Sequence, residues 1–176
     1  MAEGVNRRQL MARGTTAGLF MISGRWLWLS PAEAQAQGFT PQILSVDQAS
    51  ALATLADALV PGAQTAGIAP YIDAQLAKGD DSLLIAKYLG VDVPNQTEFY
   101  RAIADNLLQS LSGGNEAGDI AQTMAGDAIE AWQGPPASYA LFVLRCDALD
   151  VTYGHPNGFE QLGIPYMAHI APVTPW

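Results

Sequence analysis

The chain has 176 residues, which corresponds to about one domain; nearly half are apolar and only 14% are charged. This composition excludes a disordered acidic tail and a low-complexity chain. The net charge of −9 provides no basic patch for nucleic acid or anionic lipid, so neither is an expected partner. The single cysteine, Cys146, excludes an internal disulfide framework, a cysteine zinc site and an iron–sulfur cluster. No apolar run is long enough for a membrane-spanning helix.

Basic residues are concentrated at the N-terminus. Four of the eight lie in the first 25 positions, whereas only two of the seventeen acidic residues precede Gln35. Arg7 and Arg8 open the sequence RRQLM, and a modest apolar stretch follows at 14–24. This pattern is typical of a twin-arginine export signal. The alternative is an amphipathic N-terminal helix in which the arginine pair arose by chance.

Small residues that fit a signal peptidase site come next. After the helix breaker Pro31, both Ala32-x-Ala34 and Ala34-x-Ala36 match the spacing that the peptidase requires. Arg25 departs from the pattern, because its charge interrupts the apolar segment. We therefore predict a twin-arginine signal peptide over residues 1–36 and a periplasmic location.

Helical patterns joined by polar turns dominate the rest of the chain. Ser45 and Gln48 fit a capping box, and Pro61-Gly62 ends the helix that follows. Helices are expected over 45–60, 70–76, 82–89, 97–111 (capped by Thr97 or Asn95), 120–132 and 137–153. The last is apolar on nearly every side, which predicts a central position. Since no strand-like alternation stands out, residues 37–153 are expected to form an all-α domain, a compact bundle of five or six helices.

Residues 154–176 break the helical pattern, because they are rich in proline, glycine and large apolar side chains. They are too apolar for a solvated linker, and exposed apolar surface of this kind usually marks an interface. Two interpretations are open and compatible: an extended docking tail for a partner, and a tail packed onto its own helices. An irregular C-terminal tail over 154–176 is the prediction in either case.

Few residues point to catalysis, and the sequence has no GxSxG elbow, P-loop or GxGxxG motif. His155 and His169 are the only histidines; together with Asp147 or Asp150 they could form a metal site, although satisfied or exposed histidines are the favoured interpretation. Asp147 and Asp150 also lie one helical turn apart. Such a pair can do acid/base work, but capping, pairing with arginine or solvation are the simpler roles.

Three further side chains have a reactive and a structural interpretation. Arg145 can lower the pKa of the neighbouring Cys146 thiol. On so apolar a helix, however, the cysteine is expected to be a small buried hydrophobe. Asp57 and Asp73 would form a second carboxylate pair if their helices packed together, and again capping is the simpler role.

Three sequence segments, with the twin-arginine start, resemble the gluconate 2-dehydrogenase subunit 3 family. They are ATLADALVPG at 53–62, AGIAPYID at 66–73, and DVTYG at 150–154 followed by GF at 158–159 and LGIPY at 162–166. The resemblance covers nearly the whole chain through the order of the segments, none of which is highly specific alone. One departure is GIPYMAH at 163–169, where many members have a Gly-Tyr-Pro-Gly stretch.

The resemblance implies a function that composition and spacing do not contain. Members of the family are non-catalytic small subunits of periplasmic FAD-dependent sugar and polyol dehydrogenases. They carry no cofactor and bind a large flavoprotein of the glucose–methanol–choline oxidoreductase type, which holds the FAD. The small subunit carries the export signal for both, and in many complexes a cytochrome c with haem c takes the electrons onward.

The tail is the expected docking element of such a subunit. The predicted partner-binding residues are Tyr153, Phe159, Ile164, Pro165, Tyr166 and Trp176, and the export residues are Arg7 and Arg8. Two rival functions remain: an independent small periplasmic enzyme using His155 and His169, and a free-standing sugar-binding helical module. The chain offers neither rival a motif.

Overall fold

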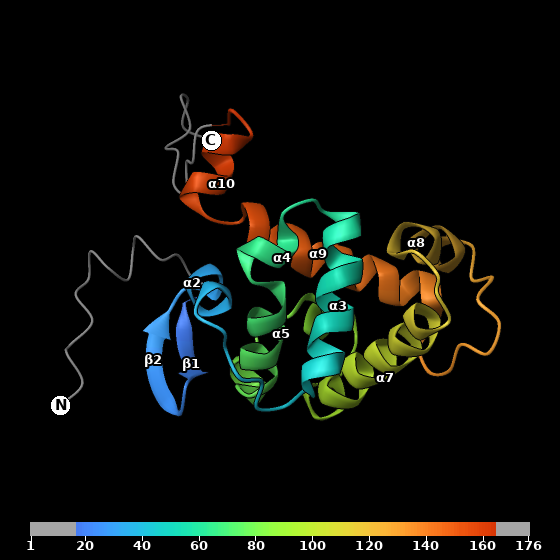
Figure 1. Ribbon diagram of the computed structural model, residues 1–176, viewed down its shortest axis with the longest axis horizontal. Helices are drawn as coiled ribbons and strands as arrows, with labels where there is room; N and C mark the ends of the chain where they lie inside the picture. The colour runs from blue at the N-terminus through green and yellow to red at the C-terminus, as the bar shows by residue number, and fades with distance from the viewer. Residues whose placement is uncertain (1–16, 165–176) are drawn as a thin grey trace, which may run out of the picture.

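The computed structural model describes residues 17–164, which form a helical body with a β-hairpin at one end (Figure 1). The hairpin strands are β1 (Gly18–Ile22) and β2 (Arg25–Leu29). The helices are α2 (Pro31–Ala36), α3 (Val46–Leu59), α4 (Ala63–Ala66), α5 (Ile68–Leu76), α6 (Ile85–Tyr88), α7 (Val93–Ser112), α8 (Ala117–Ala125), α9 (Ala137–Tyr153) and α10 (Pro156–Gln161), with a 3-10 turn, η1, at Gly79–Asp81.

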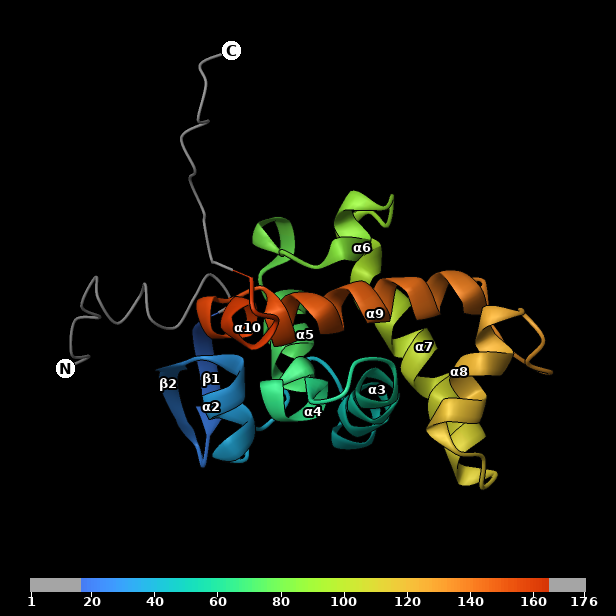
Figure 2. The same cartoon turned by 90° about the horizontal axis from the view of Figure 1, so that it is seen from above.

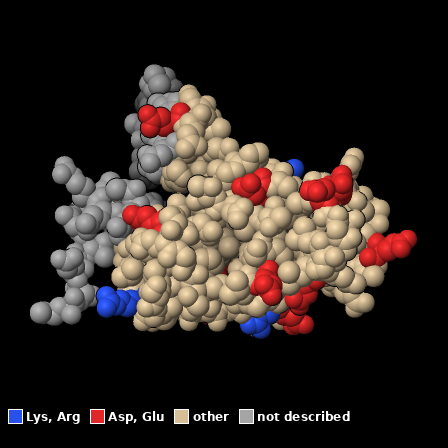
Figure 3. Space-filling view, in the orientation of Figure 1, with Lys and Arg blue, Asp and Glu red and all other residues tan. Residues whose placement is uncertain are grey.

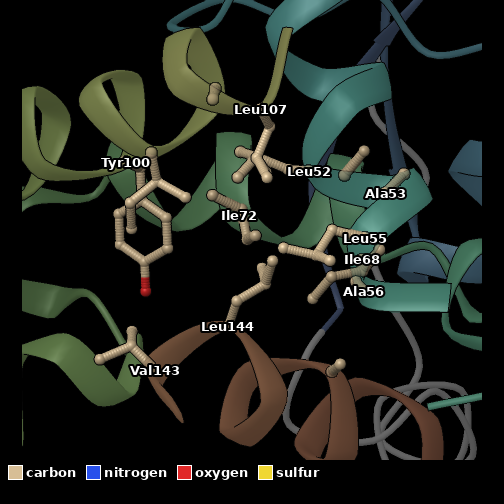
Figure 4. Packing of buried hydrophobic residues seen from close by; sticks show 14 of the residues in the cluster. Leu52, Ala53, Leu55, Ala56, Ile68, Ile72, Tyr100, Leu107, Val143 and Leu144 are labelled. Carbon is tan, nitrogen blue, oxygen red and sulfur yellow. The ribbon is translucent and has the colours of Figure 1, made fainter. Parts of the chain in front are cut away.

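The body is organised around α3, which contacts α4, α5, α7, α8 and α9. Figure 4 shows side chains from α3, α5, α7 and α9 converging in the interior. Leu52, Ile72, Leu107 and Leu144 are all fully buried there. The predicted helical bundle is therefore confirmed in outline around one large hydrophobic core. Residues 17–164 form nine helices, however, more than the five or six expected.

Local sequence explains where α3 begins and ends. The backbone N–H of Gln48 donates to Ser45 Oγ at 3.0 Å, and that of Ser45 donates to Gln48 Oε1 at 3.0 Å, so the predicted capping box is confirmed. Beyond the helix, Asp57 Oδ1 accepts the N–H groups of Gly62 and Gln64 at 3.1 and 3.0 Å. Asp57 thus stabilises the turn that leads into α4, which agrees with the capping role expected for it.

The chain is mostly helical but not strictly all-α, because two strands form within residues 18–29, a segment predicted to belong to the signal peptide. β1 and β2 pair antiparallel, with Phe20 opposite Leu27, and the connecting Ser23 and Gly24 have φ values of 47° and 79°. A two-residue turn with two positive φ angles matches the twist of a hairpin, and Ser-Gly is a suitable sequence for it. Because both faces of the strands carry apolar residues, the sequence lacks the alternation of apolar and polar residues that is typical of a strand.

Several helix boundaries also differ from those expected. The helix predicted over 120–132 ends at Ala125, because Gly126 follows and Asp127 turns back to accept the N–H of Ser138 at 2.6 Å, capping α9. α7 begins at Val93, earlier than Asn95 or Thr97, and α5 begins at Ile68. The segment 156–161, expected to be irregular, forms the short helix α10.

Figure 2 shows α9 running along the long axis, from α8 at one end to α10 at the end that carries the hairpin. Acidic side chains are scattered over the face seen in Figure 3, and basic ones are few, in keeping with the net charge of −9. Among residues 17–164, no helix has both the length and the apolar character that crossing a membrane requires.

Candidate functional site

One side of α9 carries apolar side chains that the rest of the described chain leaves uncovered. Phe142 and Leu149 are each 43% exposed, and Cys146, half-buried, lies between them. Because these positions are four and three residues apart, they form one stripe, here called the α9 outer face. The opposite side of the helix, which includes Val143, Leu144 and Val151, is buried in the core.

The α9 outer face corrects the prediction that this helix is surrounded. Its all-round apolar sequence indicated a fully buried helix, but the described chain covers only one side. The guanidinium of Arg145 lies near the Phe142 ring, with 6.0 Å between its carbon and the ring centroid. Sequence reasoning missed Phe142 and Leu149 as candidate partner contacts, although an apolar helix face can be covered by a partner as well as by its own chain.

Two glycines build a tight corner at the C-terminal end of α9. A Cβ on Gly154 would lie 2.4 Å from the Asp150 carbonyl oxygen, and one on Gly158 would lie 2.5 Å from Tyr153 Cα. Neither position has room for a side chain, so α10 folds back closely on the end of α9. Gly154 and Gly158 belong to the DVTYG and GF segments, and the absence of a side chain at each allows this close approach.

The predicted docking residues are distributed unevenly around this corner. Tyr153 is half-buried and packs against the core, and Phe159 is half-buried on α10. Ile164 is 51% exposed, as is the neighbouring Leu162 at 50%. Pro165, Tyr166 and Trp176 lie outside the described residues, as do Arg7 and Arg8. The structure thus gives an exposed apolar end to the described part of the tail.

A hydrogen bond joins two of the segments that carry the family resemblance. Tyr71, on α5, donates its hydroxyl to Asp150 Oδ2 on α9 at 3.2 Å. Burial, reinforced by the nearby carboxylates, raises the pKa of Tyr71, so the phenol stays a donor. α3, α5 and α10, which carry parts of the segments at 53–62, 66–73 and 150–159, all contact α9.

Asp147 is a buried carboxyl group one turn before Asp150. Its Oδ1 accepts the backbone N–H of Ile85 at 3.0 Å, and its Oδ2 accepts the hydroxyl of Tyr100. Burial raises the pKa of Asp147 to about 7, opposed by those two hydrogen bonds. Tyr100 is fully buried and its pKa is raised as well, chiefly by burial. Both acceptor atoms are occupied, so Asp147 ties α6 and α7 to α9.

Where the structure describes them, the histidine and aspartate residues considered for acid/base or metal chemistry make structural hydrogen bonds. His155 is the N-cap of α10, and its Nδ1 accepts the N–H of Gly158 at 3.1 Å. His169 lies outside the described residues. Within 17–164, no group of three histidine, cysteine, aspartate or glutamate side chains is arranged to hold a metal ion. His155 therefore has a structural use.

Asp73 is likewise a capping residue. Its carboxylate accepts three consecutive backbone N–H groups, from Gln42 at 2.8 Å, Ile43 at 2.9 Å and Leu44 at 2.8 Å. Asp57, described above, holds a different turn. The two carboxylates each anchor a loop, so the capping interpretation of both is the one that the contacts support.

The thiol of Cys146 is not activated. Burial, and to a lesser degree Asp147, raises its pKa, and the opposing effect of Arg145 is smaller. A raised pKa means little thiolate at neutral pH, and the thiolate is the nucleophile. The expectation of a small apolar role fits this chemistry, although the side chain is half-buried and not fully enclosed.

A polar cavity lies at the other end of the body, between α7, α8 and the loop before α9. Its volume is about 330 Å³, and its lining includes Gln109, Asp119, Glu130 and Trp132. The indole N–H of Trp132 donates to the Pro135 carbonyl at 2.7 Å, which fixes the ring. A fixed indole beside two carboxylates and an amide can accept a small polar molecule.

No protein-family model matches the chain, and neither a curated protein nor a solved structure matches it. The family resemblance therefore rests on the three sequence segments and the twin-arginine start. The structure adds that the helices carrying the described parts of these segments contact one another, and that Phe142 and Leu149 of α9 are exposed.

Proposed function

We propose that the chain is a non-catalytic small subunit of a periplasmic FAD-dependent sugar or polyol dehydrogenase complex. In this proposal it binds and stabilises a large flavoprotein of the glucose–methanol–choline type and carries that folded partner through the twin-arginine route. The FAD and the sugar chemistry belong to the partner, and a cytochrome c is the proposed onward acceptor in complexes that have one. In this proposal the chain supplies a binding interface and an export signal, and the partner supplies the reacting groups.

The observation that carries the proposal is the α9 outer face. A helix that is apolar all round normally lies inside a core, yet Phe142 and Leu149 are open to solvent on α9. Stable, permanent interfaces are enriched in apolar and aromatic side chains. A partner that covers the α9 outer face would bury the apolar side chains that this chain leaves exposed.

The C-terminal corner supports the same surface. Leu162 and Ile164 follow α10, which the close approaches at Gly154 and Gly158 hold against the end of α9. A docking element that is already oriented loses less conformational entropy when it binds. The proposed interface therefore comprises the α9 outer face and the exposed end of α10.

The experiment is a matched pair of charge substitutions in the co-expressed complex. Phe142→Glu combined with Leu149→Glu places two charges on the α9 outer face, and Val46→Glu places one on another exposed apolar residue, 68% exposed at the start of α3. The proposal predicts that the double variant loses the co-purifying FAD absorbance and sugar-dependent dye reduction, while Val46→Glu keeps both. Unchanged melting temperatures of the isolated subunits show that folding is preserved. Equal flavin recovery from all three proteins would refute the interface.

A second candidate function, the sugar-binding module, is favoured by the cavity at Trp132. Its volume of about 330 Å³ lies in the range of small-molecule sites, and Asp119, Glu130 and Gln109 provide acceptors for hydroxyl groups. A saturable rise in melting temperature with a monosaccharide, lost in Trp132→Ala and absent with an ionic-strength control, would favour this function. No rise at millimolar sugar would exclude it.

A further inference from the structure

The peptidase-like alanines at 32–36 lie inside a folded element. α2 begins with a complete capping box, in which the N–H of Ser30 donates to Glu33 Oε2 at 2.7 Å and that of Glu33 donates to Ser30 Oγ at 3.2 Å. Ala34, which belongs to both candidate sites, is 0% exposed. A protease needs an extended and accessible chain, so this segment must unfold locally before it can be cut.

The start of α2 fits against a glycine of the helical body. A Cβ built on Gly67 would lie 2.2 Å from the Pro31 carbonyl oxygen and 2.8 Å from the Ala32 nitrogen. Gly67 joins α4 to α5 and belongs to the AGIAPYID segment. The backbone of the candidate cleavage region is therefore in direct contact with one of the segments that carry the family resemblance.

The hairpin before α2 is attached to the body as well. Phe20, Ile22 and Leu29 are buried with Ala34 in one cluster, against which Ala74 of α5 packs. On the far side of β1, the N–H of Thr40 donates to the Met21 carbonyl at 2.8 Å. Cleavage after Ala34 or Ala36 would remove both strands and leave their contacts on the body open to water.

We propose that residues 17–36 remain in the exported protein as a structural part, because folding closes the peptidase site at Ala32–Ala36. The inference rests on the export route in the proposed function. Proteins that use the twin-arginine route cross folded, so the peptidase meets the chain with α2 already packed. The hairpin and α2 then belong to the mature protein, and cleavage after Ala34 or Ala36 does not occur.

The first test is the intact mass of the exported chain. The full-length protein, with a C-terminal tag, is expressed in a bacterium that has the twin-arginine system, and the periplasmic fraction is analysed by mass spectrometry. The proposal predicts a mass that contains residues 17–36. A chain that begins at Gln35 or Gln37 would overturn it.

A second test does not depend on export. Full-length chain purified from the cytoplasm is incubated with signal peptidase, once native and once unfolded in urea that the enzyme tolerates. We expect cleavage of the unfolded chain only. Cleavage of both at equal rates, or of neither, would overturn the claim that folding closes the site. Absence of the chain from the periplasm would refute the export route alone, and this assay would still decide the inference.

A matched pair of glycine variants identifies the contact responsible. Gly67→Ala and Gly62→Ala introduce the same methyl group at φ values of 88° and 94°, but a Cβ at Gly62 meets nothing within 4 Å. The shared backbone strain cancels between them. Gly67→Ala, which pushes α2 outward, should raise the rate of cleavage of the native chain by about tenfold or more over Gly62→Ala. Equal rates would show that the Gly67–Pro31 contact does not protect the site.

Discussion

The helical body and the N-terminal hairpin bury apolar side chains on different scales. In the body, residues of α3 to α9 contribute to one large cluster, where residues such as Leu52 and Leu144 are fully enclosed. The hairpin end has a cluster of four buried residues and keeps Trp26 and Leu19 more than half exposed. Two paired strands are marginal alone, so the hairpin depends on the body it covers. The comparison predicts a cooperative body and a hairpin that opens more readily.

The largest expected effect separates the two regions directly. Leu52→Ala leaves a cavity in the centre of the body and should lower the free energy of unfolding by about 3–5 kcal/mol. Phe20→Ala removes a larger side chain but should cost less globally, because the hairpin can detach while the body stays folded. Chemical denaturation with hydrogen exchange measures both. Equal global losses would show that the hairpin and body unfold as one unit.

The next effect is a pH dependence confined to the body. The pKa of Asp147 is raised to about 7 in the folded protein, so the native state binds a proton that the unfolded state releases near pH 4. The stability that this group contributes is therefore present below pH 4 and is lost as the pH rises through 7, by at most about 4 kcal/mol.

Asp147→Asn isolates this contribution, because the amide keeps the shape without the titration. The difference in unfolding free energy between variant and wild type should move in favour of the variant between pH 4 and pH 8. Urea denaturation at a series of pH values checks it, with Asp105→Asn on the surface of α7 as the control. A difference that is flat with pH would mean that Asp147 stays ionised in the fold.

Asp73 sits where the two regions join, and its loss should have an intermediate effect. In Asp73→Asn, the remaining oxygen still accepts the backbone N–H groups of Ile43 and Leu44. The new amide NH₂ replaces the oxygen that accepted the N–H of Gln42, so that N–H loses its acceptor. An expected cost of about 1–3 kcal/mol follows. Amide exchange at residues 42–44 should accelerate before exchange in α3 does. Acceleration in α3 first would place the weak point inside the body.

The smallest effect is expected on the α9 outer face. Leu149→Ser removes apolar surface that the described chain leaves open, so the unfolding free energy of the isolated subunit should change by less than about 0.5 kcal/mol. The same substitution at Leu144, which is five residues earlier on α9 and fully buried, provides the contrast. Calorimetry of both variants decides the point. A large loss for Leu149→Ser would mean that this side of α9 is covered within the chain.

Much of the body follows from local sequence. The box at Ser45 and Gln48, the stop at Pro61-Gly62 and the apolar run at 137–153 predict α3 and α9 closely, because caps and periodicity act within a few residues. The hairpin was missed although Ser23-Gly24 offered a turn, since its strands are apolar on both faces. The prolines of the tail masked α10, where Pro156 occupies the first turn, a position that tolerates proline.

Long-range partners explain the other differences. Asp73 caps a loop about thirty residues earlier, and Asp147 bonds to groups on α6 and α7, so neither role is visible in a local pattern. The composition of α9 indicated burial but could not say whether its own chain or a partner provides it. The contact between Gly67 and Pro31 likewise cannot be predicted from a local sequence pattern, because the fold brings the two residues together.

The flavin content of the complex that this chain forms tests the central claim most directly. The tagged full-length chain is co-expressed with its neighbouring reading frames, recovered from the periplasm, and examined by its visible spectrum and sugar-dependent dye reduction. The account predicts a yellow complex with FAD in stoichiometric amount and dehydrogenase activity that resides in the larger subunit. A colourless, exported chain that is recovered alone and without activity would contradict it.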